Sequence, residues 1–322
     1  MSKTLDIVLL LALPASGKSE VRRYLKFQPP EVCRDFFHMG PTVQLDDFPY
    51  VHMMRCIDDE LINLKQPRMF FDAPDKPFKN PIDWGTLTEM LNEDYADLLA
   101  KKVAKPKSAA RFWYERIDAA AQKVGGPVRF AKLDKNIAEK VVQPLEAEAK
   151  KMLEEKHAAY TDLAGKTLVI EFARGGADGS AMPLAKPFGY QYSLGTLTDA
   201  ILKKATILYI WVTPEESRRK NTARTDPNNP GSILNHGVPM EVMMKDYGCD
   251  DMDYLKKSAG KPDHVMITKG SQKFYLPIGI FDNRVDKTTF LRDDPKKWDS
   301  KKVVEVRDGL KAALDKVASL SV

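Results

Sequence analysis

Short apolar runs alternate with amphipathic stretches toward both ends of this 322-residue chain. Apolar runs typical of buried strands lie at residues 5–11, 42–45, 166–172 and 206–212. Stretches with the apolar spacing of helices follow them at about 18–26, 52–64 and 193–203, and from residue 213. Alternation of strands with helices predicts a parallel sheet that carries helices on both faces, so the expected fold class is α/β.

The middle of the chain has a different pattern. Residues 67–84 are rich in Pro, Phe and Asp and predict a long ordered loop. Helical spacing then covers about 87–103, 109–123 and 134–159, and Pro144 predicts a kink or a break in the last of these helices. We therefore expect residues 1–65 and 166–322 to form the core and residues 66–165 to form a large α-helical insertion.

The C-terminal part is less regular. Residues 264–268 and 274–281 have the character of strands, and residues 302–319 predict a closing amphipathic helix.

The segment Ala12-Leu-Pro-Ala-Ser-Gly-Lys-Ser19 directly follows the first apolar run. Backbone N–H groups at such a strand-to-helix turn can surround phosphates, and the helix N-terminus favours the same charge. Gly17 permits a close backbone approach, Lys18 can neutralise phosphate charge, and the Ser19 hydroxyl is placed for Mg²⁺. An ordinary surface turn is the alternative. The predicted nucleotide-binding residues are Leu13, Pro14, Ala15, Ser16, Gly17, Lys18 and Ser19.

Carboxylates follow the second and third apolar runs. Asp46 and Asp47 lie where a carboxylate can take a proton from a hydroxyl group or hold Mg²⁺. Asp46 is the predicted catalytic base, and Asp47 is predicted to support the metal or the substrate. The alternative for this pair is a solvated turn that caps the next helix. Glu171 is a further metal candidate, and its pairing with Arg174 or another base is equally consistent with the sequence.

A basic segment, Arg-Arg-Lys-Asn-Thr-Ala-Arg, covers residues 218–224. Clustered guanidinium groups can neutralise the charge of a transferring phosphoryl group, and Arg219 and Arg224 are the residues predicted to do so. The turn-rich residues 226–231 that follow are expected to form a mobile lid. A solvated basic helix face is the alternative.

Several other polar residues are weaker candidates. The Arg174-Gly-Gly176 segment predicts a flexible basic turn that could contact phosphate or substrate. Arg55 and Arg68 are candidate substrate anchors by position alone. Three further residues suggest no mechanism: His236, Asp250 and Asp251.

Three of these segments resemble known enzymes. Residues 13–19 resemble the G-x-P-x-S-G-K-S loop of P-loop kinases, the group that includes uridine kinase, gluconate kinase, zeta-toxin-like kinases and polynucleotide kinase, although Ala12 replaces the first Gly. Residues 45–50 are similar to the Asp-Asp-Phe-Tyr stretch of uridine-kinase-like and nicotinamide-riboside-kinase-like enzymes, which implies that Asp46 is the base; Pro49 interrupts that stretch. Residues 220–224 resemble the [RK]-N-x-x-R element that begins the lid of zeta-toxin and polynucleotide-kinase-like proteins.

The resemblance implies a P-loop NTPase-like fold, ATP and Mg²⁺ as ligands, and transfer of the γ-phosphoryl group to a hydroxyl acceptor. The sequence leaves the acceptor open. Two other functions also stay open: an NTP-hydrolysing switch that acts on a macromolecular partner, and a nucleotide-binding protein without catalysis.

Composition narrows the setting. The net charge of +5, with acidic and basic residues interspersed, favours small anionic ligands over a dedicated nucleic-acid surface, although a polynucleotide acceptor is not excluded. Cys33, Cys56 and Cys249 have no metal-binding spacing in the sequence and suggest a reducing compartment. We find neither a signal peptide nor an apolar run of about 20 residues, so a cytoplasmic protein without membrane contact is the expectation.

Overall fold

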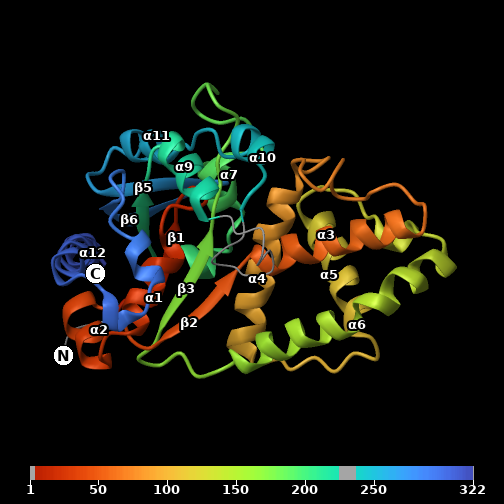
Figure 1. The fold of residues 1–322 in the computed structure, drawn as a ribbon, viewed down its shortest axis with the longest axis horizontal. Coiled ribbons are helices and arrows are strands. Elements are labelled where there is room, and N and C mark those ends of the chain that lie inside the picture. The colour runs from red at the N-terminus through yellow and green to blue at the C-terminus, as the bar shows by residue number, and fades with distance from the viewer. Residues whose placement is uncertain (1–3, 225–236, 322) are drawn as a thin grey trace.

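The computed structural model describes residues 4–224 and 237–321. Its centre is a six-stranded sheet of order β2-β3-β1-β4-β6-β5, in which neighbouring strands are parallel except for the antiparallel pair β5 and β6 (Figure 1). The strands are β1 (Ile7–Leu11), β2 (Thr42–Asp46), β3 (Thr167–Phe172), β4 (Ala205–Trp211), β5 (His264–Lys269) and β6 (Gln272–Asp282). Every strand that the sequence indicated is present.

The α-helices of the described ranges are α1 (Lys18–Lys26), α2 (Pro30–Phe37), α3 (Phe48–Asn63), α4 (Asp83–Ala100), α5 (Ala109–Lys123), α6 (Lys135–Ala158), α7 (Gly189–Thr196), α8 (Asp199–Leu202), α9 (Pro214–Arg224), α10 (Met240–Lys245), α11 (Met252–Ser258) and α12 (Ser300–Leu320). Short 3₁₀ turns lie at Phe130–Lys132, Thr289–Arg292 and Pro295–Lys297. The apolar spacing did not predict α2, α10 or α11. None of the helices in these ranges is long and apolar enough to cross a membrane.

Helices cover both faces of the sheet, as the α/β pattern predicts. Successive side chains of β1 point to opposite faces: Ile7, Leu9 and Leu11 enter one core, while Val8 and Leu10 enter the other. The first core includes residues of α4, α7, α8 and α11, and the second is closed by α1, α2 and α12. Because both faces are buried, β1 is apolar at every position.

A third core lies beside the sheet and joins α3, α4, α5 and α6 (Figure 1). The helix α3, which begins at the end of β2, packs here rather than on the sheet. The helix α4 belongs to two cores, because its residues Leu87 and Met90 enter this third core while Leu91 and Leu98 enter a core of the sheet. The helical region therefore rests on the sheet through α4.

The prediction of one helix at residues 193–203 was wrong, because the helix starts earlier and is divided into α7 and α8. It begins at Gly189, because the carboxylate of Asp251 accepts hydrogen bonds from the backbone amides at positions 190 and 191. It stops after Thr196, and α8 begins at Asp199. The side chain of Asn92 on α4 donates to the Thr196 carbonyl and accepts from the Thr198 amide, so a distant residue satisfies the groups that the break exposes.

Pro144 does not break the last helix of the insertion. It lies inside α6, which runs for 24 residues. Proline removes one backbone donor from a helix, but the buried residues Val142 and Leu145 on either side of it enter the third core. Packing against α3 and α5 thus holds the helix through the proline.

The two-core role of α4 gives a matched test of the fold. Leu98 is 1% exposed and Leu99 is 55% exposed, although the two residues are adjacent on α4. We predict that Leu98→Ala lowers the free energy of unfolding by about 2–5 kcal/mol, because it leaves a cavity under the sheet. Leu99→Ala should change it by about 0.5 kcal/mol or less. Equal losses in urea denaturation of the two variants would contradict the packing of α4.

Candidate functional site

A cavity of about 1110 Å³ opens at the carboxyl ends of β1, β2 and β3. One wall is the 14–19 loop after β1, and Asp46 lies at the end of β2. The opposite wall comes from α3 and from the insertion, through Phe48, Phe71 and Trp84 among others. The sequence-predicted loop and acidic pair therefore meet in one cavity, as parallel sheet topology requires.

The loop after β1 carries three consecutive backbone amides without an acceptor. No hydrogen bond from the N–H groups of Ala15, Ser16 or Gly17 to any group in residues 4–224 and 237–321 is present. Ala15 has a φ of 54° and Gly17 a φ of 106°, both in the left-handed region. Successive N–H groups in a turn of this kind can form an anion-binding hollow. These three amides therefore remain available to a ligand in the cavity.

Residues from the far end of the chain hold this loop from behind. Asn283 Nδ2 donates to the Ser16 carbonyl at 2.6 Å, and Ser217 Oγ donates to the Pro14 carbonyl at 2.7 Å. A side chain at Gly17 would meet Thr288 Oγ1 at 2.5 Å. Sequence reasoning missed these supports, because they act across more than 200 residues of chain.

Two cations face the cavity beside the loop. The Nζ atom of Lys18 donates to the carbonyls of Ala12 and Leu13, and the residue is 8% exposed. Burial lowers the pKa of Lys18, Glu171 opposes this effect, and the charge of Arg224 adds to it. Neither Lys18 nor Arg224 forms an ion pair within 4.0 Å with a carboxylate of the described chain. A bound anion would relieve the repulsion between them.

Asp46 also lines the cavity and forms no ion pair within 4.0 Å with a basic group of the described residues, although the charge of Arg22 acts to lower its pKa. Its side chain accepts a hydrogen bond from Gln44 Nε2 at 3.1 Å. Burial raises the pKa of Asp46 to about 7, and the charges of Glu171 and Asp47 act in the same direction. A carboxylate of this kind can take up a proton near neutral pH.

Glu171 is not free for a metal in this structure. Arg22 of α1 donates to its Oε2 atom at 2.7 Å, and Arg22 also contacts Gln44. Of the two readings that the sequence left open for Glu171, the structure shows the pairing with a base, although the base is Arg22 rather than Arg174.

Arg174 does not form a flexible basic turn, and this expectation was wrong. Its side chain is 2% exposed, and its guanidinium lies 5.0 Å from the rings of Trp84 and Phe172. Its Nη1 atom donates to Asp47 Oδ2 at 2.6 Å, and its Nε atom donates to Ser193. Asp47 therefore lines the cavity with one oxygen already committed to this buried ion pair.

The basic helix α9 directs its side chains to different places. Arg224 lines the cavity, whereas Arg219 is paired with Glu216 at 2.7 Å and is not among the residues of the cavity wall. Lys220 is buried against Asp286 and Thr288, so it braces the loop support. The expected lid at residues 226–231 and His236 lie outside the described residues.

The remaining candidates divide into cavity and structural residues. Arg55 lines the cavity, with its guanidinium 4.0 Å from the ring of Phe71. Arg68 pairs with Asp59 away from it. Asp251 caps α7, and Asp250 accepts a hydrogen bond from Tyr209 at 2.6 Å. Asp250 and Asp251 are therefore structural in this fold.

The wall opposite the loop contains one polar group that the sequence did not reveal. Asp246 is 5% exposed and lines the cavity, and its Oδ2 atom accepts no hydrogen bond from the described residues. Burial raises the pKa of Asp246 to about 7. Five aromatic residues line the same cavity: Phe48, Phe71, Phe78, Trp84 and Tyr247.

Comparison of this chain with protein-family models, curated proteins and solved structures gives no match. The chemistry of the site must therefore be inferred from its own geometry.

The raised pKa of Asp46 predicts how the stability of the protein depends on pH. Because its pKa is raised from 3.8 to about 7 on folding, the folded state binds more protons, and stability falls as the pH rises from about 4 to about 7. Asparagine cannot ionise, so Asp46→Asn removes the stability cost of the buried charge. We predict that it raises the free energy of unfolding at pH 8 by about 1–3 kcal/mol, measured by urea denaturation.

Asp47→Asn is the matched control. It breaks the buried ion pair with Arg174 and should lower the free energy of unfolding by about 3 kcal/mol or more. If Asp46→Asn destabilises the protein at pH 8 as much as Asp47→Asn does, Asp46 is not the isolated carboxylate that the structure shows.

Proposed function

We propose that this protein is a P-loop kinase-like phosphotransferase that moves the γ-phosphoryl group of ATP to a hydroxyl acceptor. The observation that carries the proposal is the hollow formed by the unpaired amides of residues 15–17, with Lys18 beside it. A triphosphate supplies several anionic oxygens for these amides and for Lys18, in a cavity that Asp46 also lines.

The surrounding charges support an anionic substrate with a reacting end. Lys18 and Arg224 lack close ion-pair partners in the described chain, whereas Arg22 and Arg174 are satisfied by Glu171 and Asp47. The protein thus leaves unpaired cations where phosphate would bind. Electrostatic stabilisation of this type is the main contribution of a protein to phosphoryl transfer.

Asp46 is the proposed base. It would accept the proton of the acceptor hydroxyl as the new oxygen–phosphorus bond forms and the bond from the γ-phosphorus to its bridging oxygen breaks, which releases ADP. Its raised pKa suits proton uptake near neutral pH. Arg224 is placed to neutralise the transferring group, while Arg219 would have to leave Glu216 to do the same.

The oxygen donors at the loop fit Mg²⁺, which prefers oxygen ligands. Ser19 and Asp47 line the same cavity as Asp46, whereas Glu171 is held by Arg22. When bound, Mg²⁺ supplies positive charge to the phosphate oxygens.

The wall opposite the loop suits an acceptor with an apolar face and a hydrogen-bond donor. Aromatic rings offer flat apolar contacts, and the unpaired Oδ2 atom of Asp246 offers an acceptor for a hydroxyl or amine. Residues 66–165 contribute part of this wall, through which the insertion would select the acceptor.

Lys18→Ala tests the phosphate site. We predict that it lowers ATP affinity at least tenfold in isothermal titration calorimetry, because a cation within the loop is lost. Lys257→Ala, an exposed residue of α11 outside the cavity, is the control. Unchanged ATP affinity of Lys18→Ala would refute the assignment of the loop.

Asp46→Asn tests the base. We predict that kcat falls about 10²–10⁴-fold in an ADP-release assay with a panel of hydroxyl acceptors, while ATP affinity stays near the wild-type value. In the wild type, kcat/KM should rise with pH and level off above about 7, because only the ionised carboxylate accepts a proton.

The same assay separates the alternatives. ADP release that depends on an acceptor supports a kinase. ATP hydrolysis that needs no acceptor and is stimulated by a macromolecule indicates a switch. Tight ATP binding without turnover indicates a binding protein. Either of the last two results would overturn the proposal.

A further inference from the structure

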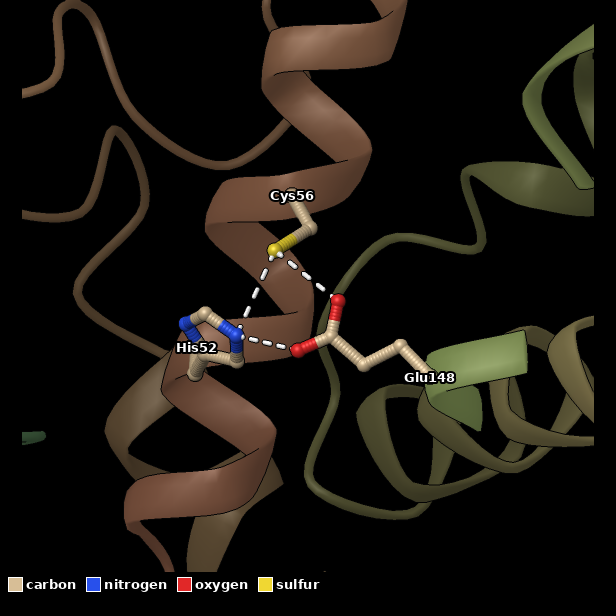
Figure 2. Close-up of side chains that lie close together, drawn as sticks. All are labelled: His52, Cys56 and Glu148. Carbon is tan, nitrogen blue, oxygen red and sulfur yellow. Dashed lines mark hydrogen bonds and ion pairs between the residues drawn. The ribbon is translucent and has the colours of Figure 1, made fainter. Parts of the chain in front are cut away.

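A second cluster of reactive side chains lies on α3 and α6, on the side of the helical region (Figure 2). His52 and Cys56 are one helical turn apart on α3 and share a face, and Glu148 reaches toward them from α6. The ligand atoms of the three residues all lie within 4.8 Å of one another. The proposed phosphotransfer uses none of them.

The distances within the cluster approach those of a tetrahedral metal site. Bonds of about 2.1 Å to nitrogen and oxygen and about 2.3 Å to sulfur place tetrahedral ligand atoms roughly 3.3–3.6 Å apart. The Cys56 Sγ atom lies 3.6 Å from His52 Nε2 and 3.9 Å from Glu148 Oε2. His52 Nε2 and Glu148 Oε1 are closer, at 2.6 Å, because they form a hydrogen-bonded pair that has to open slightly.

We propose that His52, Cys56 and Glu148 bind a divalent transition-metal ion of the Zn²⁺ type. A donor set of imidazole nitrogen, thiolate sulfur and carboxylate oxygen suits Zn²⁺ and disfavours Mg²⁺ and Ca²⁺, which prefer oxygen alone. This site is therefore chemically distinct from the magnesium site of the proposed phosphotransfer and does not rest on that function.

The surroundings of the cluster favour a cation and leave it access. The side chains of His52 and Glu148 are 47% and 42% exposed, so an ion can enter from solvent and a water molecule can complete the coordination. Asp59 and Glu60 add negative charge near Cys56. Binding would release the thiol proton, and any proton held between the imidazole and the carboxylate, to solvent.

The position of the cluster gives the ion a structural consequence. Val51 and Arg55 on α3 line the cavity. His52 directly follows Val51 in the sequence, and Cys56 directly follows Arg55. An ion shared with Glu148 would tie the helix that carries this cavity wall to α6, the last helix of the insertion. Metal binding to the folded state should therefore also raise the melting temperature.

Cobalt substitution tests the proposal without any nucleotide or acceptor. The untagged full chain is stripped with a chelator, dialysed and titrated with Co²⁺. We expect one Co²⁺ per chain, intense visible absorption of a tetrahedral site and a near-ultraviolet thiolate-to-cobalt band, all abolished by one equivalent of Zn²⁺. Cys56→Ser should remove the thiolate band, and His52→Ala and Glu148→Gln should each weaken affinity at least ~10-fold.

Cys249→Ser is the matched control, since Cys249 is also partly buried but contacts the Ala177 carbonyl far from this cluster. It should keep the full spectrum. The proposal is overturned if Co²⁺ gives no thiolate band, or if the band survives in Cys56→Ser and disappears in Cys249→Ser. Circular dichroism of each variant separates loss of ligand from loss of fold. Because ATP is absent, a negative result here leaves the phosphotransfer proposal intact, and the reverse also holds.

Discussion

The proposed site depends on three consecutive backbone amides that have no acceptor in the described chain. The N–H groups of residues 15–17 lie in a loop in which Ala15 and Gly17 adopt left-handed backbone angles, and Asn283 and Ser217 hold the loop carbonyls in place. An N–H group gains free energy when it finds an acceptor in a cavity that excludes water. The proposed chemistry follows from the anion that these amides, in a loop at the end of β1, are available to bind.

Ion pairing then decides which charged groups remain available. Arg22 neutralises Glu171, and the buried Arg174 neutralises Asp47, so two of the three acidic candidates have basic partners. Asp46 forms no such ion pair in the described residues, and its pKa is raised. Lys18 and Arg224 form no ion pair with a carboxylate in the described ranges. A carboxylate and two cations without ion-pair partners in the described residues are the groups on which the proposed phosphoryl transfer depends.

Local patterns in the sequence predicted local structure well, and contacts between distant residues explain the failures. The bounds of α1 and α5 and the alternation of strands and helices follow from apolar spacing, and the positions of Lys18 and Asp46 follow from strand ends. The start of α7 depends on Asp251, and the pairing of Glu171 depends on Arg22, about 150 residues away. The sequence did not predict the cluster of His52, Cys56 and Glu148, because its third member lies on α6, far from the other two along the chain.

The most direct test of the central claim observes the loop amides themselves. In ¹⁵N-labelled protein, a non-hydrolysable ATP analogue with Mg²⁺ should shift the amide signals of Ala15, Ser16 and Gly17 downfield with one common saturation curve, because each amide gains a phosphate acceptor. The amide of Leu99, on the exposed face of α4, should not move. Loop amides that stay unshifted at saturating analogue, while signals elsewhere respond, would contradict the account.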